Sequence, residues 1–423
     1  MKLIFLLVLI AVLLSMSCKV KQNLSKKSPE MTAAKILGNP DYKAICYGGY
    51  RQKTREIQPT LAELKEDLKI MHAMGIRIVR TYNVHLAEAG NLLKAIREMK
   101  SEDPNFEMYV MLGAWIDCKN AWTHLPLDHN AESDNNEIEI HRAVTLANEY
   151  PDIVKIMSVG NEAMVKWAAS YYVQPWVILK WVEYLQALKK ESKLPRDLWI
   201  TSSDNFASWG GGTADYHVED LNKLIHAVDY ISMHTYPMHD THYHPDFWGV
   251  KTSESDFSDK KKVDATMVRA RDYAIHQYRS VVRYMRSIGV NKPVHIGETG
   301  WATNSNEHYG QNGSRATDEY KSAMYYKLMM EWSDINRVSC FYFEAFDEQW
   351  KDSANPAGSE NHFGLIDLQS RAKYALWEMV DKGVFKGLTR DGRPISKTFE
   401  GDEEALWKTV SIPRTAESLK TYK

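Results

Sequence analysis

The stretch VKIMSVGNEA (residues 154–163) is typical of a buried strand that ends in an amide and a carboxylate. It is followed by PWVILKWVEYLQALKKES (residues 175–192), in which apolar residues recur at helical spacing with charged residues between them. A β-rich run followed by such a helix is one βα unit, the repeating element of a parallel sheet. This unit therefore predicts strands that lie side by side under a layer of helices.

The same alternation recurs along the chain. Eight β-rich runs are visible: KAICYGGY (43–50), IRIVRTYN (76–83), EMYVMLGAWI (107–116), VKIMSVGNEA (154–163), LWITSSDN (198–205), DYISMHTYP (229–237), KPVHIGETGW (292–301) and VSCFYFEAF (338–346). Further helical patterns are TLAELKEDLKIMHAMG (60–75), TMVRARDYAIHQYRSVVRYMRSIG (266–289) and DEYKSAMYYKLMMEWSDIN (318–336). Eight units predict a single (β/α)8 TIM barrel, a fold that typically needs about 250 residues and grows by loop insertion.

The predicted barrel domain covers residues 39–423 and has no internal linker. The part after about Gly383 lacks periodicity, and we expect a short C-terminal extension packed on the barrel. With 44% hydrophobic and 26% charged residues the chain can bury a large core. The net charge of -2 excludes the broad basic field that nucleic-acid binding requires. Thirteen Trp and twenty-three Tyr are available for the core or as flat platforms for a hydroxyl-rich ligand.

The N-terminus has the pattern of an export signal. An apolar run over residues 3–14 is too short to span a bilayer and precedes the small-residue stretch 15–17, so residues 1–17 are predicted to be a signal peptide. LLSMSC, which ends at Cys18, resembles a bacterial lipobox, in which the cysteine is lipidated. Residues 18–38 then read as a solvated tether. We expect an exported cell-envelope lipoprotein in the outer membrane, or otherwise a periplasmic or secreted protein, with the lipid as its only membrane contact.

The remaining cysteines and a histidine cluster do not predict a metal site. Three cysteines lack ligand spacing and are expected to be small buried hydrophobic residues: Cys46, Cys118 and Cys340. Four histidines lie within eleven residues: His234, His239, His242 and His244. Their spacing specifies no closed zinc site, so solvent-exposed loop histidines or a sugar contact are the expectation. No metal and no cofactor are predicted.

Several side chains that could take part in catalysis lie at the ends of the predicted strands. Active sites of such barrels lie at the carboxyl ends of the strands. Asn161 and Glu162 end the fourth strand and Glu298 ends the seventh, while the other ends carry Arg80, Tyr82, Asn83, Trp115, His234 and Tyr236. Two carboxylates on nearly opposite strands, among aromatic and amide side chains, are what cleavage of a glycosidic bond requires.

Three motifs carry a resemblance to a known family. VGNEA (159–163) and GETGWAT (297–303) resemble the paired signatures of glycoside hydrolase family 17, the β-1,3-glucanase family of the retaining barrel glycosidases. FEAFDEQWK (343–351), followed by ENHFGL (360–365), is similar to the fungal and bacterial branch of that family. The resemblance extends from about Tyr42 to Leu376 but leaves out the segment 233–259.

The resemblance implies roles for individual residues. Glu162 would be the general acid/base, Glu298 the nucleophile, and Asn161 a hydrogen-bond partner of the sugar 2-hydroxyl. Tyr236 occupies the position from which a tyrosine hydroxyl touches the nucleophile, and Glu348 with Lys351 match an auxiliary pair. Retention places the two carboxyls about 5–5.5 Å apart, so ionised Glu298 should raise the pKa of Glu162.

Three aromatic residues near these positions have two interpretations each. Trp301, Trp115 and Tyr82 are candidate sugar contacts, and each could instead belong to the core at the barrel rim. Trp301 follows the predicted nucleophile, so its ring could stack on a pyranose and hold the anomeric carbon in place. Glu344 matches no catalytic position, and an ion pair with Arg80 or Arg77 is the simpler prediction.

The sequence leaves several functions open. The first is retaining, endo-acting hydrolysis of a β-1,3-glucan such as laminarin, with the polysaccharide and its oligosaccharides as the partners of a monomer. The second is glucanosyl transfer by the same site, and a third is action on another β-glycan, such as a galactoside or mannoside. A non-catalytic, glycan-binding lipoprotein is the alternative from another class. The intact glutamate pair disfavours that alternative.

Overall fold

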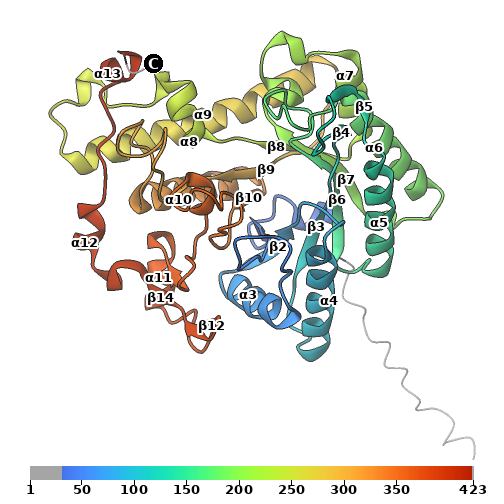
Figure 1. Ribbon diagram of the computed structural model, residues 1–423, viewed down its shortest axis with the longest axis horizontal. Helices are drawn as coiled ribbons and strands as arrows, with labels where there is room; N and C mark the ends of the chain where they lie inside the picture. The colour runs from blue at the N-terminus through green and yellow to red at the C-terminus, as the bar shows by residue number, and fades with distance from the viewer. Residues whose placement is uncertain (1–30, 422–423) are drawn as a thin grey trace, which may run out of the picture. The chain divides into compact units, whose positions relative to one another are not determined.

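The computed structural model describes residues 31–421 and contains a closed barrel of eight parallel strands (Figure 1). The strand order around the barrel is β1-β10-β9-β8-β7-β6-β3-β2. The strands are β1 (Lys43–Cys46), β2 (Ile76–Arg80), β3 (Tyr109–Ala114), β6 (Val154–Asn161), β7 (Trp199–Asn205), β8 (Ile231–His234), β9 (Val294–Gly300) and β10 (Cys340–Phe343). Each lies within one of the eight predicted runs, so the predicted (β/α)8 barrel is confirmed.

Helices surround the strands, as the periodicity predicts. The long ones are α3 (Leu61–Ala73), α4 (Ala87–Glu102), α5 (Asn135–Glu149), α6 (Pro175–Lys190), α7 (Glu219–Ala227), α9 (Asp259–Ser287) and α10 (Glu319–Asn336). α3 begins where Thr60 and Glu63 form a capping box, a reciprocal pair that satisfies two free backbone N–H groups. α9 begins before the predicted stretch because the side chain of Ser258 accepts a hydrogen bond from Lys261 N.

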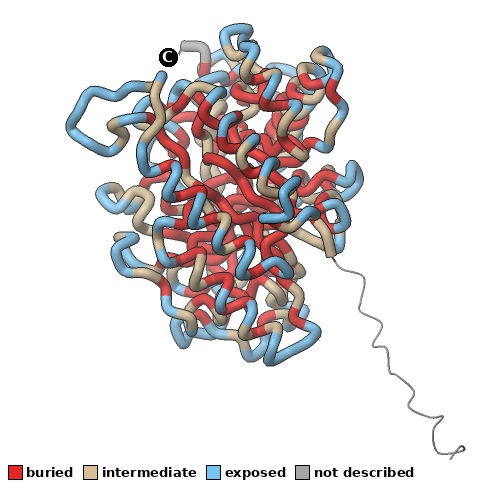
Figure 2. Tube along the Cα trace, turned by 90° about the vertical axis from the view of Figure 1, so that its right-hand side faces the viewer, coloured by how far each residue is buried: buried red, intermediate tan, exposed pale blue. Residues whose placement is uncertain are grey.

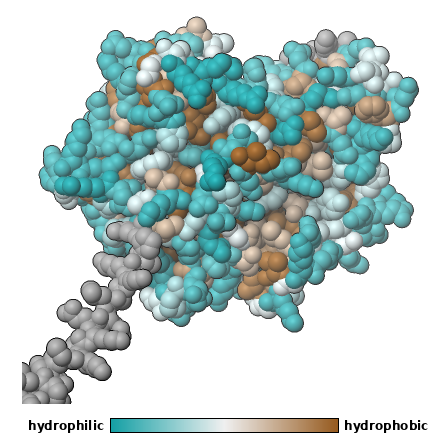
Figure 3. Space-filling view, turned by 180° about the vertical axis from the view of Figure 1, so that it is seen from behind, coloured by the Kyte–Doolittle hydropathy of each residue, from teal (hydrophilic) through white to brown (hydrophobic). Residues whose placement is uncertain are grey.

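The core lies in and around the barrel strands. Figure 2 shows the strands as buried segments and the connecting loops as the exposed ones. Every residue of β3 and β9 is buried, as expected when a parallel sheet is covered on both faces. Cys46, Cys118 and Cys340 are free and buried, as predicted. The face in Figure 3 is mainly hydrophilic, with separate apolar patches.

The loops at the carboxyl ends of the strands contain short elements. They include β4 (Cys118–Lys119), which pairs with β5 (Asp128–Glu132), and a π-helical turn η1 (Ala207–Gly211). The 3-10 turns are η2 (Ala214–Tyr216), η3 (Pro245–Phe247), η4 (Thr252–Glu254), η5 (Ser359–Asn361), η6 (Tyr374–Leu376) and η7 (Thr398–Gly401).

The histidine-rich segment corrects one prediction. It forms helix α8 (Pro237–Tyr243) instead of an open loop. His234 is fully buried on β8, and His239 and His242 are only partly exposed, so the expectation of exposed loop histidines is right for His244 alone. Ring stacking shields His239 from solvent, because its ring lies against that of Tyr236 with centroids 5.2 Å apart. Within residues 31–421 no group of three metal-ligating side chains is found.

The C-terminal extension contacts the barrel helices. It contains β11 (Arg371–Ala372), α11 (Trp377–Asp381), β12 (Thr389–Arg390), β13 (Arg393–Pro394), β14 (Ser396–Lys397), α12 (Glu403–Lys408) and α13 (Ala416–Thr421), shown in red in Figure 1. Arg390 Nε lies 2.9 Å from Asp67 Oδ1 on α3, and Lys321 Nζ on α10 donates to Ser411 O at 2.6 Å. Buried ion pairs and backbone contacts thus attach the extension.

The described part of the N-terminal segment is not a solvated tether. Helix α2 (Ala33–Ile36) buries Ala33 and Ile36, and Gly38 N donates to Ser339 Oγ at 2.8 Å. The predicted tether boundary at residue 38 is therefore wrong, because apolar side chains already pack from residue 33 onward. The signal peptide and Cys18 lie outside the described residues. Among residues 31–421, no helix has the length and apolar character needed to cross a bilayer.

Candidate active site

The end of β6 turns sharply at Glu162. Gly160 has φ 79°, and a Cβ at this position would lie 2.9 Å from the Ala163 Cβ, so only glycine fits. Glu162 itself has φ 47°, a left-handed conformation that is uncommon for non-glycine residues. Its backbone N–H donates to Ser203 O at 3.0 Å, which fixes this turn against β7.

Glu298 lies on β9 at a point of close strand contact. A Cβ on the preceding Gly297 would lie 2.0 Å from Ser232 Oγ, so glycine allows β9 and β8 to approach each other. Three donors surround the Glu298 carboxylate. Arg80 Nη1 and the Tyr82 hydroxyl donate to Oε2 at 2.7 and 2.9 Å, and the Tyr236 hydroxyl donates to Oε1 at 2.6 Å.

These donors keep Glu298 ionised. Burial alone would raise its pKa, but His234, Arg80 and the two tyrosine hydroxyls outweigh burial and lower the pKa below the usual value. Burial lowers the pKa of His234 to about 3, so its imidazole is neutral near pH 7 and supplies a positive charge to Glu298 only in acid. Arg80 is thus the cation that balances the carboxylate.

Glu162 has the opposite electrostatic environment. Burial and then the negative charge of Glu298 raise its pKa well above the usual value. Its Oε1 lies 3.1 Å from His234 Nδ1, and His234 Nε2 lies 2.7 Å from Ser203 Oγ. Glu162 is therefore held protonated and oriented beside an ionised Glu298.

Arg80 also connects the two strand ends. Its Nη2 donates to Asn161 Oδ1 at 2.5 Å, while Nη1 donates to Glu298 and to Gly297 O. The guanidinium is 1% exposed, so these contacts are made out of water. One buried arginine therefore aligns Asn161, next to Glu162, with the carboxylate of Glu298.

A cavity of about 970 Å³ is lined by Glu298 and by Asn161, the neighbour of Glu162 in the chain. Six predicted site residues line it: Tyr82, Trp115, Asn161, Glu298, Glu348 and Lys351. Its lining includes an aromatic cluster from the loops after β3 and β6, in which Trp122 stacks on Tyr171 at 5.6 Å and Trp115 lies 5.1 Å from Tyr171. A second aromatic pair, Tyr50 and Trp350, comes from the loops after β1 and β10, with ring centroids 5.8 Å apart. A cleft with two groups of aromatic side chains suits an extended sugar chain.

Comparison with known proteins assigns the chain to a family. The family model for the BtgE/BtgC glycoside hydrolase domain matches residues 44–364. The chain belongs to this family. A solved endo-laminarinase from Formosa Hel1_33_131 is 65% identical, with a TM-score of 0.91, and the match covers 91% of this chain and 98% of that one.

More distant relatives match the chain in sequence or in fold. A glucan 1,3-beta-glucosidase of Arthroderma benhamiae is 26% identical over 321 residues, which cover 74% of this chain and 83% of that protein. A putative glucan endo-1,3-beta-glucosidase (btgC) of Aspergillus niger is 22% identical, and the match spans only 40% of its length. A family 17 β-1,3-glucanosyltransferase of Rhizomucor miehei is 18% identical with a TM-score of 0.55, a likeness of fold.

One predicted sugar contact of this glycoside hydrolase is wrong. Trp301 has no exposed surface, and its Nε1 donates to Ala316 O at 2.8 Å. Its ring packs against Tyr325 and Trp248, with centroids 5.0 and 5.6 Å away. Trp301 therefore belongs to the core behind β9, because the chain turns its side chain outward to the helix layer after Glu298.

The predicted pair of Glu348 and Lys351 is present, with Lys351 Nζ 3.2 Å from Glu348 Oε2, but Glu344 is arranged differently from the prediction. Glu344 forms its ion pair with Lys351, not with Arg80 or Arg77. Both carboxylate oxygens of Glu348 accept hydrogen bonds: Oε1 from Tyr50 N at 2.9 Å, and Oε2 from Trp350 Nε1 at 2.8 Å. Lys351 thus lies between two buried carboxylates, which explains why burial fails to lower its pKa.

Several cavity residues were not predicted as site residues. They are Tyr50, Arg55, Glu88, Trp122, Tyr171, Trp350 and Glu360. Most of them lie in a loop or a first helical turn that follows a barrel strand. Their position after a strand end is the signal in the sequence that could have identified them as site residues. Their residue types alone do not separate a cavity wall from an exposed loop.

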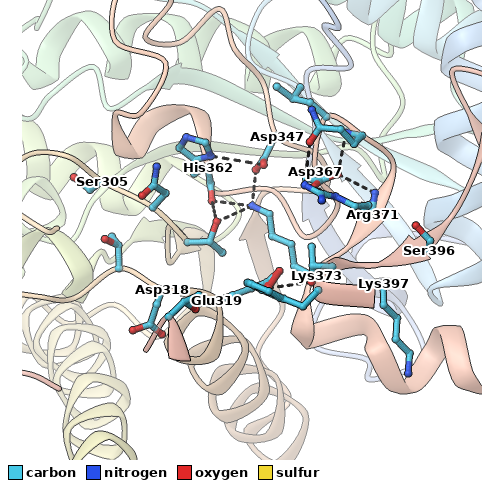
Figure 4. Close-up of a pocket in the computed structure, with 18 of the residues that line it drawn as sticks. Ser305, Asp318, Glu319, Asp347, His362, Asp367, Arg371, Lys373, Ser396 and Lys397 are labelled. Carbon is cyan, nitrogen blue, oxygen red and sulfur yellow. Dashed lines mark hydrogen bonds and ion pairs between the residues drawn. The ribbon is translucent and has the colours of Figure 1, made fainter. Parts of the chain in front are cut away.

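A larger cavity, of about 1390 Å³, has neither glutamate in its lining. Figure 4 shows the side chains that line it. It is formed by the loops after β9 and β10 and by the C-terminal extension. Its charged side chains pair with one another: Lys373 with Asp347 at 2.8 Å and Arg371 with Asp367 at 2.7 Å. Among the described residues, none of its lining side chains has a buried polar atom without a partner. It therefore shows no sign of a ligand site.

Proposed function

We propose that this protein is a retaining, endo-acting β-1,3-glucanase of glycoside hydrolase family 17 that hydrolyses laminarin-type glucans. One observation carries the mechanism: Glu298 on β9 accepts hydrogen bonds from Arg80, Tyr82 and Tyr236, whereas Glu162, directly after β6, lies beside His234. In these surroundings the pKa of Glu298 is lowered and that of Glu162 is raised. The substrate class follows from the endo-laminarinase that is 65% identical over nearly the whole chain.

In the first step Glu298 attacks the anomeric carbon and displaces the glycosidic oxygen. Glu162 donates its proton to that leaving oxygen, so a covalent glycosyl-enzyme and a free sugar chain result. In the second step ionised Glu162 takes a proton from water, and the water oxygen attacks the same carbon and releases Glu298. Tyr236, Tyr82 and Arg80 orient the nucleophile through the contacts measured above.

The charge of the cleft supports a neutral polymer as substrate. The lysine and arginine side chains of its lining are Arg55, Arg142 and Lys351, and Lys351 is already paired with Glu344 and Glu348. The cleft therefore offers few free positive charges to a polyanionic glycan. Carboxylates and aromatic faces instead match the hydroxyl groups and apolar ring faces of glucose units.

We propose further that residues 1–17 direct export and that Cys18 carries a lipid that anchors a monomeric enzyme to the cell envelope, in the outer membrane. The apolar run and the lipobox-like LLSMSC support this. Mass spectrometry of the mature N-terminus tests it: a lipid-modified Cys18 is expected, and an unmodified residue elsewhere would contradict it.

The activity test uses protein without residues 1–18, incubated with laminarin, mixed-linkage β-glucan, cellulose and β-mannan. We expect laminarin to be cut to a ladder of short oligomers, and Glu298→Gln to be inactive although folded. Products longer than the substrate would instead indicate glucanosyl transfer. A folded wild-type protein that cleaves none of the four glycans would contradict the proposed function.

A further inference from the structure

One carboxyl group in the cleft has no assigned role. Glu88 is the second residue of α4, just after the loop that follows β2, and it lines the 970 Å³ cavity. The residue is only 3% exposed. Its buried Oε1 has no hydrogen-bond partner among residues 31–421. Glu88 is thus a buried polar group whose partner is missing from the protein itself.

An unpartnered buried carboxyl destabilises a fold, because it has lost water and gained nothing in exchange. The neighbouring Glu348 shows the contrast, since all its contacts are made: Tyr50 N at 2.9 Å, Trp350 Nε1 at 2.8 Å and Lys351 Nζ at 3.2 Å. Glu348 therefore positions the wall of the cleft, whereas Glu88, which lines the same cavity, has a buried Oε1 without a partner.

The surroundings of Glu88 have the composition of a sugar site. Tyr50 and Trp350 lie edge to face at 5.8 Å, and the Arg55 guanidinium covers Trp350 at 4.4 Å. Trp350 is partly exposed and lines the same cavity. A polar group that fixes orientation beside aromatic side chains is the usual arrangement for binding a hydroxyl-rich ligand.

We propose that Glu88 hydrogen-bonds a hydroxyl group of a glucose unit and so forms a sugar-binding subsite among the cleft residues that follow β1, β2 and β10. This inference rests on the proposed β-1,3-glucanase function. Burial, and then the charge of Glu348, raise the pKa of Glu88 well above its usual value, which favours a neutral carboxyl group. A neutral carboxyl can both donate to and accept from one hydroxyl. The sugar supplies the partner that the protein lacks.

The test compares Glu88→Met and Glu88→Gln, each made also in the inactive Glu298→Gln background. Calorimetry with laminarihexaose should show affinity about ten- to hundredfold weaker for Glu88→Met, the effect of losing one buried hydrogen bond. Glu88→Gln keeps a donor and an acceptor and should bind within about threefold of the parent. In the active enzyme, Glu88→Met should raise KM more than it lowers kcat.

Thermal unfolding separates binding from a structural role. Glu88→Met removes an unpartnered polar group, so its Tm should rise while its affinity falls. The matched control is Glu319→Met, because Glu319 is equally buried, faces the other cavity and accepts from Thr398 Oγ at 3.0 Å. The control should lower Tm and leave laminarihexaose affinity unchanged.

A Glu88→Met protein that binds laminarihexaose like the parent, or that has a lower Tm or fails to fold, would overturn the subsite. If wild-type enzyme still cleaves laminarin in that case, the proposed function stands without the subsite. If wild-type enzyme cleaves no β-1,3-glucan and Glu298→Gln binds no laminarihexaose, both proposals are overturned together.

Discussion

Replacing Arg80 by Met should shift the pH dependence of catalysis and destabilise the fold. Arg80 Nη1 lies 2.7 Å from Glu298 Oε2, with the two side chains 1% and 9% exposed. Without the guanidinium, burial becomes the dominant influence on Glu298 and its pKa rises. Removing one partner of a buried ion pair typically lowers the unfolding free energy by about 3–5 kcal/mol.

The sign of the pH effect follows from the wild-type direction. The pKa of Glu298 is lower in the folded protein than in the unfolded chain, so its ionisation stabilises the fold above the ordinary glutamate pKa, about 4.3. That contribution is lost as the pH falls through the folded-state pKa. In Arg80→Met the acid limb of kcat/KM on laminarin should move to higher pH, because the nucleophile must be ionised.

Urea unfolding and the pH profile of kcat/KM measure the two effects. The matched control is Arg77→Met on the same strand, since within residues 31–421 the Arg77 guanidinium donates to His72 O and Ile76 O and to neither glutamate. The control should leave the acid limb in place. An Arg80→Met variant whose acid limb and stability both equal those of wild type would refute this account of the site.

Two further predictions concern Glu162 and Trp301. Glu162→Gln should lower kcat on laminarin by about 10²–10⁴-fold, yet lose far less on an aryl glycoside whose leaving group needs no proton; equal losses on both substrates would contradict its role as acid. Trp301→Ala should lower the unfolding free energy by about 3–5 kcal/mol in a urea titration, because the ring is fully buried. Its KM for laminarin should stay unchanged. A raised KM at wild-type stability would show instead that Trp301 contacts the sugar.

The sequence by itself determined the eight strands and the type of barrel. Each strand run is rich in β-forming residues, and most are followed by apolar residues at helical spacing. Residues close together in the sequence are therefore enough to predict these elements. The carboxyl ends of parallel strands meet at one end of the barrel, which is why Glu162 and Glu298 could be paired from their positions alone. Tyr236 reaches Glu298 from the next strand for the same reason.

Only the tertiary structure decided which side chain contacts which. Arg80 pairs with Glu298 although β1 and β10 lie between their strands in the sheet order, so the contact crosses the barrel interior. Trp301 turns into the helix layer, and Glu88 faces the cleft without a partner. Such choices depend on burial and on groups distant in the chain, and a local pattern of residue types does not encode them.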